Sequence, residues 1–388
     1  MTRKVLAVTG TRAEYGSMRP VFAAIASASG LELELVVTAM HLAPQFGSSL
    51  AEVEADRYGP LHYAKADDTA ETGVAMARGL GQMLLAMTGI VERARPDVIL
   101  LQGDRGEMLA GALAGAHQNV AVVHMSGGDV SGSIDDPMRH AVSSFAHIHL
   151  TTCAPSTARL LARGESADRI FEVGEPALDV IRSLQPVPPQ ELARELDLDL
   201  TRPVVLATQH PVTTEAGAAG RQITETLEAL ATLGLQTVFT YPNTDAGGAE
   251  MLRVLQSYGS RPYLRIAPHL GSRKYMSLMK IAAVMVGNSS SGILEAASFK
   301  LPVVNVGTRQ HGRTRAGNVI DADYERVAIA EAVQRALHDG VFRRALQSCV
   351  NPYGDGSTAP KTVDILRRLK LTPALLAKWL PASEPFLE

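Results

Sequence analysis

A serine-rich turn, Asn288–Glu295, carries side chains that are suited to binding a phosphate. An apolar run ending at Gly287 precedes it and apolar residues at helical spacing follow it, so the sequence predicts a strand, a tight turn and a helix. Free N–H groups and hydroxyls at a helix N-terminus attract an anion. Glu295 lies about one helical turn further on, where a carboxylate would bind a ribose diol. An ordinary serine N-cap explains the same turn without a ligand.

Asp104 and Arg105 stand side by side on a glycine turn after the apolar run 97–101. One interpretation is an acid/base carboxylate, with Arg105 keeping it ionised or holding a substrate. The other interpretation is that Asp104 is a simple helix N-cap.

A second acidic group follows the next predicted strand. Asp129, Asp135 and Asp136 are interleaved with glycine and serine, and Arg139 comes directly after them. Pro137 at the first helical position makes Asp135 or Asp136 the helix cap, which explains one aspartate but not all three. Neighbouring carboxylates separate each other's pKa values, so one acts as a base while another stays protonated as an acid.

Other polar segments also follow predicted strands. Arg12, at a helix start, suits an anion, although a surface arginine fits the position equally well. A lone histidine is usually structural, but several such segments at carboxyl strand ends together favour a binding function. The segments centre on His41, His210, Asn243 and the stretch Arg309–Arg313. The sequence has no Walker lysine, no G-x-G-x-x-G and no clustered metal-ligand motif, which disfavours a P-loop, a nicotinamide cofactor and a metal site.

Fully apolar runs alternate with helical periodicity along the chain, which predicts an α/β protein with parallel sheets covered on both faces. The proline-rich stretch 185–189 interrupts the alternation and is predicted to be a linker. We therefore expect two doubly wound Rossmann-like domains, 1–184 and 185–360. A helical tail, 361–388, would pack back on the first domain. The cleft between the domains is the expected site.

Composition restricts the class of protein. The 388 residues are 46% hydrophobic and 20% charged, which is typical of a globular protein with a substantial core. The net charge of −3 predicts no general attraction to nucleic acid or to an anionic membrane. The two cysteines are far apart in sequence, which predicts a reduced, cytoplasmic setting. No signal peptide or membrane-spanning run is expected.

Taken together, these segments resemble the hydrolysing UDP-N-acetylglucosamine 2-epimerases of sialic-acid and related nonulosonic-acid biosynthesis. The resemblance extends in order over roughly residues 4 to 320. The segments that carry it are Gly10-Thr11-Arg12-Ala13-Glu14-Tyr15, Thr38-Ala39-Met40-His41, Gly103-Asp104-Arg105, the stretch from Gly127 to His140, His210-Pro211-Val212-Thr213-Thr214, Gly287 to Gly292, and Gly307 to Arg313.

The resemblance implies a glycosyltransferase-B-like fold, a homodimer or homotetramer, no cofactor, and a nucleotide-sugar substrate. It implies that Ser290, Ser291 and Arg12 hold the diphosphate and that Glu295 holds the ribose. It places His210 and Asn243 near the nucleotide, and Asp104, Asp129, Asp135 and Asp136 on the sugar side.

The implied reaction starts at the anomeric carbon, because no carbonyl acidifies the proton on sugar carbon 2. Breaking the bond to the diphosphate gives oxocarbenium character, which allows a carboxylate to remove that proton and leave a glycal and UDP. Water then adds to the anomeric carbon while a proton returns to carbon 2 from the opposite face. The products would be N-acetylmannosamine and UDP.

One departure from the family pattern bears on the sugar. Some members have a glutamate where this chain has Ser126, and a serine cannot replace a carboxylic base. Other hydrolysing members also lack that glutamate, so Asp129 gains importance. The alternatives are the same chemistry on a UDP- or GDP-linked 2,4-diacetamido-6-deoxyhexose, a glycosyltransferase on the same fold, and a nucleotide-sugar-binding regulator without catalysis.

Overall fold

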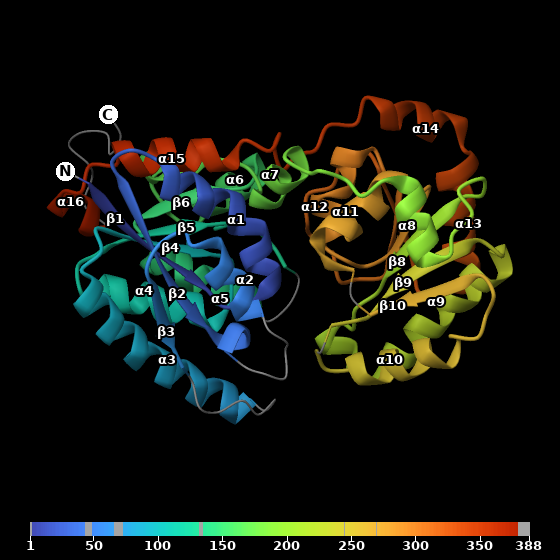
Figure 1. Cartoon of the computed structure of the whole chain (residues 1–388), viewed down its shortest axis with the longest axis horizontal. Helices are drawn as coiled ribbons and strands as arrows, with labels where there is room; N and C mark the ends of the chain where they lie inside the picture. Colours follow the sequence, from blue (N-terminus) through green and yellow to red (C-terminus); the bar gives the residue numbers. More distant parts are fainter. Residues whose placement is uncertain are drawn as a thin grey trace. The chain divides into compact units, whose positions relative to one another are not determined.

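The computed structural model describes residues 2–42, 49–65, 73–131, 135–243, 245–268 and 270–378. These residues form two compact units, which Figure 1 shows in sequence colours. Among the described residues, the first unit takes its residues from the ranges 2–130, 135–182 and 353–378, and the second takes Ser131 and its residues from the range 183–352. The chain passes between the units at Arg182 and Tyr353, whereas the sequence predicts boundaries at 184 and 360.

The first unit contains a parallel sheet of seven strands among the described residues. Their order is β3-β2-β1-β4-β5-β6-β7. The strands are β1 (Arg3–Thr9), β2 (Leu31–Thr38), β3 (Leu61–Ala64), β4 (Val98–Gln102), β5 (Ala121–Met125), β6 (Ile148–Thr151) and β7 (Ile170–Glu172).

Helices cover both faces of this sheet, as its uniformly apolar strands require. Helices α1 (Arg12–Ser27), α2 (Ser49–Asp56) and α15 (Thr358–Arg368) share one core cluster, and α3 (Gly73–Ala94), α4 (Gly106–His117) and α5 (Asp135–Phe145) share the other. The remaining helices are α6 (Ala154–Ala162), α7 (Pro176–Arg182) and α16 (Pro373–Leu376).

The second unit repeats this architecture with a sheet in the order β10-β9-β8-β11-β12-β13. Its strands are β8 (Val204–Thr208), β9 (Gln236–Thr240), β10 (Leu264–Ala267), β11 (Val284–Gly287), β12 (Val303–Val306) and β13 (Val319–Ala322). Its helices are α8 (Pro189–Leu196), α9 (Ala219–Leu233), α10 (Gly248–Ser257), α11 (Gly271–Ile281), α12 (Ser291–Leu294), α13 (Arg326–His338) and α14 (Gly340–Gln347).

Each sheet has one point at which the strand order reverses. In the first unit this switch point lies between β1 and β4, and in the second it lies between β8 and β11. The connections leave these neighbouring strands toward opposite sides, which opens a crevice at their carboxyl ends where ligands bind in such folds. The predicted segments around Asp104 and Ser290 each follow a strand at a switch point.

The C-terminal segment completes the core of the first unit. Helix α15 packs against α1, and Leu366 is fully buried. Asp179 caps the start of α15, because its carboxylate accepts from the backbone N–H groups of Thr358 and Ala359, each at 2.9 Å. The predicted tail therefore belongs to the first unit, although Trp379 lies outside the described residues.

Helix α3 differs from the expectation of no membrane-spanning run. In the described part of the chain, its residues Val74–Ala94 are long and apolar enough to cross a membrane by length and composition alone. Met83, Met87 and Ile90 on one side of this helix are buried in the core that it shares with α4. That arrangement is typical of a helix that covers a sheet.

Two local features differ from a plain interpretation of the sequence. The stretch 185–189, predicted to be a linker, follows the crossing at Arg182 and is anchored to the second unit, because Val187 is buried, its N–H binds Ser277 Oγ at 2.9 Å, and Pro189 begins α8. The helix after the serine turn is also shorter than predicted. Helix α12 ends at Leu294 and a 3-10 turn follows it, so little helix dipole supports the turn.

Leu366→Ala is expected to lower the free energy of unfolding of the first unit by about 2–5 kcal/mol, because it leaves a cavity under α15. Denaturant unfolding followed by circular dichroism measures the change. Leu371→Ala is the matched control, since Leu371 is 40% exposed and its removal should cost less than about 0.5 kcal/mol. Equal effects of the two variants would contradict the packing of α15 on the first unit.

Candidate functional site

The turn after β1 brings two carboxylates close to Gly10. The N–H of Gly10 donates to Glu14 Oε2 at 2.9 Å, and a Cβ on Gly10 would lie 2.1 Å from Glu107 Oε1, so a larger residue there would require the Glu107 side chain to move. Burial, with a contribution from Glu107, raises the pKa of Glu14 to about 8. Glu107 also accepts from Arg105 Nε at 2.8 Å. Neither glutamate is among the predicted site residues, although Glu14 lies in the Gly10–Tyr15 segment that carries the resemblance and both follow predicted strands.

Arg12 and His41 border the same turn. Arg12 begins α1 and lies 3.7 Å from Glu52 Oε1, on the surface. His41 is buried, and its ring nitrogens lie 3.1 Å from Thr9 Oγ1 and 3.0 Å from Ser49 Oγ. Burial and then the nearby Arg12 lower the pKa of His41 to about 4, so the ring is neutral near pH 7. In this structure both ring nitrogens of His41 are bonded within the unit.

Asp104 lies beside Arg139. Both are predicted site residues, but the sequence gives no sign that they are in contact. The Arg139 guanidinium donates through Nη2 to the Asp104 carboxylate. Its Nη1 donates to the Ser126 carbonyl oxygen at 2.9 Å. The Arg139 side chain is 6% exposed and that of Asp104 is 19% exposed. Asp104 is therefore a carboxylate with a fixed orientation and a remaining solvent-accessible part.

Ser126 has an unusual backbone. Its φ is 62°, a left-handed conformation that a residue with a Cβ rarely adopts, and its side chain is 5% exposed. Its hydroxyl is buried and has no hydrogen-bond partner among the described residues. A strained residue of this kind is often found at a functional site.

His124 attaches the Asp104 turn to the core. Its Nε2 donates to the Gly103 carbonyl at 2.8 Å, and its Nδ1 accepts from the Ser143 hydroxyl at 3.0 Å. Burial lowers the pKa of His124 to about 3, which keeps the ring neutral and fixes these roles. The sequence signal for this role was a histidine within the otherwise apolar strand β5.

Asp129 has a different setting from Asp104. Its Oδ1 accepts from Thr152 Oγ1 at 2.6 Å and from Ser156 Oγ at 2.5 Å, so the loop is anchored to the start of α6. Asp135 and Asp136 are the first two residues of α5, and the side chain of Asp135 lies outside the described part of the structure. The first unit thus brings Asp104 and Arg139 into contact, while Asp129 is bonded to other residues.

The serine turn of the second unit depends on Gly287. Gly287 has a φ of +126°, and a Cβ there would lie 2.0 Å from the Thr208 carbonyl oxygen. The close approach brings the ends of β8 and β11 together at the switch point. Ser290 then precedes α12 and Ser291 begins it.

Asn288 joins the two strands at this switch point. Its side-chain oxygen accepts from His210 N at 2.7 Å and its amide donates to His210 O at 2.9 Å. His210 Nδ1 in turn accepts from Asn243 N at 3.0 Å. Burial and then the nearby Arg309 lower the pKa of His210 to about 3. The predicted residues His210 and Asn243 are thus held next to the serine turn.

Arg309 and Glu295 lie beside the same turn. Arg309 Nη1 and Gln310 Nε2 donate to the Asn288 carbonyl at 3.3 Å and 2.8 Å. Burial raises the pKa of Glu295, which stands directly after α12. The Arg313 side chain is half-buried in the loop that follows β12. The second unit therefore gathers hydroxyls and guanidinium groups where an anion would be stabilised.

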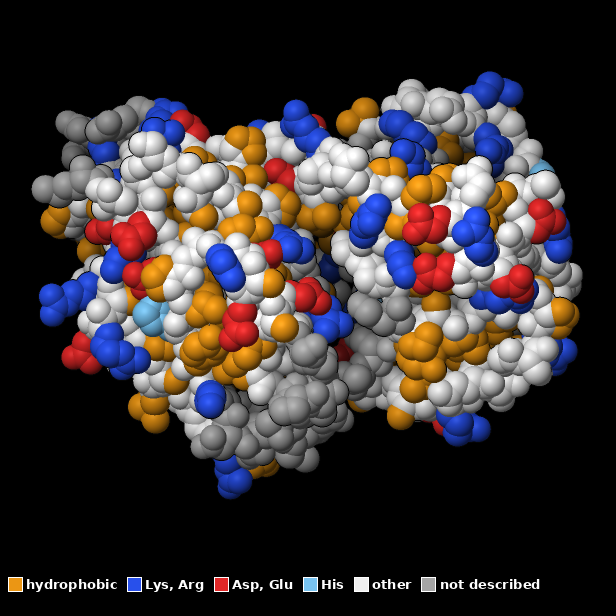
Figure 2. All heavy atoms as spheres, viewed as in Figure 1, with side chains coloured by type: hydrophobic (Ala, Val, Ile, Leu, Met, Phe, Trp, Pro, Cys, Tyr) orange, Lys and Arg blue, Asp and Glu red, His pale blue; other side chains and the backbone are white. Residues whose placement is uncertain are grey.

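Each unit supplies a different chemical capacity. The first presents carboxylates that can move protons, and the second presents donors suited to a phosphate. Within the described ranges no group of three or more His, Cys, Asp and Glu residues is placed to hold a metal ion. On the face shown in Figure 2, acidic and basic side chains are interspersed on both units.

Comparison with known proteins identifies relatives along most of the chain. A family model described as UDP-N-acetylglucosamine 2-epimerase matches residues 23–367. A Legionella pneumophila protein named UDP-N,N'-diacetylbacillosamine 2-epimerase (hydrolyzing) is 38% identical over 97% of this chain and 99% of its own length. A Neisseria meningitidis UDP-N-acetylglucosamine 2-epimerase is 34% identical over 88% of this chain and 89% of its own length. A Campylobacter jejuni GDP/UDP-N,N'-diacetylbacillosamine 2-epimerase (hydrolyzing) is 33% identical over 83% of this chain and 84% of its own length.

A solved structure shows the same fold. The crystal structure of UDP-GlcNAc 2-epimerase from Neisseria meningitidis bound to UDP-GlcNAc covers 94% of this chain and 99% of its own, with a TM-score of 0.81 and 19% identity. The expected glycosyltransferase-B-like architecture of two parallel α/β domains is confirmed.

Gly287→Ala is expected to lower the melting temperature, because the added Cβ forces β8 and β11 apart. Thermal unfolding followed by circular dichroism measures the effect. Gly271→Ala is the control, since Gly271 has a φ of +69° but no atom within 4 Å of the added Cβ. A melting temperature that falls equally in both variants would contradict a role for this close approach.

Proposed function

Because the chain belongs to the UDP-N-acetylglucosamine 2-epimerase family, we propose that it is a hydrolysing 2-epimerase that releases UDP from a UDP-linked 2-acetamido sugar. The observation that carries the proposal is Asp104, a carboxylate that the buried Arg139 orients at the switch point of the first unit. Ligands bind at such points in doubly wound sheets.

In the proposed reaction the second unit binds the nucleotide. Ser290 and Ser291 bind the diphosphate, and Glu295 binds the ribose. Negative charge grows on the diphosphate as the anomeric bond breaks, so hydroxyl and guanidinium donors there stabilise the transition state.

The first unit performs the proton chemistry. Asp104 is a base or acid at sugar carbon 2, and Arg139 keeps its carboxylate in place. Elimination gives a glycal and UDP. Water then adds to the anomeric carbon and a proton returns to carbon 2 from the opposite face, which requires a second proton donor. Asp129, Asp135 and Asp136 are the candidates, although Thr152 and Ser156 already bind one oxygen of Asp129.

The preferred sugar within this proposal is the 2,4-diacetamido-6-deoxyhexose of UDP-N,N'-diacetylbacillosamine. Support comes from the Legionella pneumophila relative, which matches almost the whole chain at 38% identity. UDP-N-acetylglucosamine, the sugar nucleotide that the sequence first predicts, is the second candidate, supported by the 34% identical Neisseria meningitidis relative.

Incubating the purified protein with each sugar nucleotide in deuterated water tests the reaction. UDP should be released, and the free sugar should carry deuterium at carbon 2, because that proton exchanges with solvent during elimination and hydration. Nuclear magnetic resonance follows both events. UDP release without deuterium at carbon 2 would contradict the epimerase and favour simple hydrolysis or transfer.

Asp104→Asn should reduce kcat at least about 100-fold while UDP still binds, because the amide cannot accept a proton. Steady-state kinetics measures kcat and calorimetry measures UDP binding. Turnover close to wild type in Asp104→Asn would remove Asp104 from the mechanism.

Ser290→Ala should instead raise KM by about three- to tenfold with a smaller effect on kcat, since it removes one donor to the diphosphate. Steady-state kinetics separates the effect on KM from the effect on kcat.

A further inference from the structure

Helix α5 holds the Asp104 turn at two points. Arg139 binds the Asp104 carboxylate, and Ser143 binds His124, which binds the Gly103 carbonyl oxygen. Arg139 and Ser143 are four residues apart, so they lie on the same face of α5. A displacement of α5 along its axis would therefore move both attachments together.

The C-terminal end of α5 is fixed by a residue distant in sequence. Lys378 Nζ donates to the carbonyl oxygens of Ser143 and Ser144, at 2.8 Å and 3.0 Å, and to Glu165 Oε1 at 2.7 Å. The three donors of its ammonium group thus have three acceptors. A cation at this position also interacts favourably with the negative end of the helix dipole.

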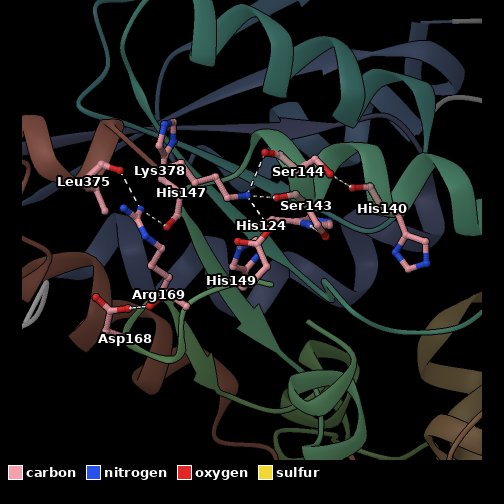
Figure 3. A network of polar contacts seen from close by, with 12 residues as sticks. His124, His140, Ser143, Ser144, His147, His149, Asp168, Arg169, Leu375 and Lys378 are labelled. Atoms are coloured by element: carbon pink, nitrogen blue, oxygen red, sulfur yellow. Dashed lines mark hydrogen bonds and ion pairs between the residues drawn. The ribbon is translucent and has the colours of Figure 1, made fainter. Parts of the chain in front are cut away.

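This ion pair lies inside the protein. The side chains of Lys378 and Glu165 are 9% and 8% exposed, and Glu165 Oε2 lies 3.1 Å from Nε2 of the buried His149. Strand β6 pairs His149 with His124 of β5. Figure 3 shows Lys378 reaching from the C-terminal segment to Ser143 and Ser144, with His124 and His149 close by. The contacts form a continuous path from the C-terminal segment to the Gly103 carbonyl.

We propose that Lys378 is a positioning residue for Asp104, acting through helix α5 and its Arg139 and Ser143 contacts. The inference rests on the proposed function of Asp104. It adds that the C-terminal segment controls the chemical step and not the binding of the nucleotide, which the second unit performs.

Lys378→Met keeps an unbranched side chain, one atom shorter than lysine, and removes the three hydrogen bonds of the ammonium group. We expect kcat to fall about tenfold or more, because small displacements of a catalytic group are costly, while KM and the UDP dissociation constant stay within about twofold. Lys378→Met combined with Glu165→Gln avoids an unpaired buried carboxylate and should show the same pattern if the single variant folds poorly. Lys361→Met is the matched control, since Lys361 is on exposed α15 surface and should leave kcat unchanged.

A double-mutant cycle identifies the path. If Lys378 acts through residue 143, adding Ser143→Ala to Lys378→Met should reduce kcat by less than the product of the two single effects. Adding Ser290→Ala to Lys378→Met should reduce kcat by the product of the two single effects, because Ser290 lies in the second unit and acts independently. An unchanged kcat in Lys378→Met, a loss of UDP affinity as large as the loss of kcat, or independent effects of the Lys378 and Ser143 substitutions would each overturn the inference.

Amide hydrogen exchange separates this inference from the proposed function, because it requires no substrate. Exchange in the segment 101–106 should be faster in Lys378→Met than in wild type and Lys361→Met, and unaltered exchange would overturn the inference. If the wild-type protein releases UDP from neither sugar nucleotide, the proposed function fails. The exchange result then still decides whether Lys378 fixes the Asp104 turn.

Discussion

The bonds of Arg139 hold together two loops near the switch point of the first unit. One buried guanidinium binds the Asp104 carboxylate after β4 and the Ser126 carbonyl after β5. Two loops from neighbouring strands are thereby held in one arrangement, and a buried charge is compensated. Removing either partner would leave an unpaired buried group, which is far more costly than the net contribution of the pair suggests. This constraint explains why a strained Ser126 and a partly exposed Asp104 persist side by side.

The second unit uses a side-chain amide at its switch point. Asn288 replaces missing backbone partners between β8 and β11 by accepting from and donating to the same residue, His210. Its carbonyl is in turn bound by the Gln310 amide. The serine turn is therefore held by neutral hydrogen bonds together with one from the Arg309 guanidinium, and a phosphate would meet hydroxyls that are already in place, which lowers the entropic cost of binding.

The sequence predicted correctly those elements whose structure depends on a local pattern of residues. The fully apolar parallel strands were predicted, because burial on both faces leaves a plain pattern. The edge strands β3 and β13 were missed, since residues such as His62 and Asp321 interrupt their apolar runs. Asp104 and Arg139 were both selected as site residues, but their contact joins residues 35 apart in sequence and no periodicity reports it. The anchoring of Asp129 by Thr152 and Ser156 was likewise invisible, as was the path through His124.

The discontinuous first unit has a consequence for biosynthesis. A ribosome releases the strands of this unit first, then the whole second unit, and only afterwards α15 and Lys378. During that interval the surface of α1 that Leu366 will cover is exposed, and the end of α5 lacks its cation. Domains usually fold as units during synthesis, from the N-terminus onward. Here the oldest part of the nascent chain is finished last, so a chain that stalls before residue 358 would carry a folded second unit and an unfinished first unit.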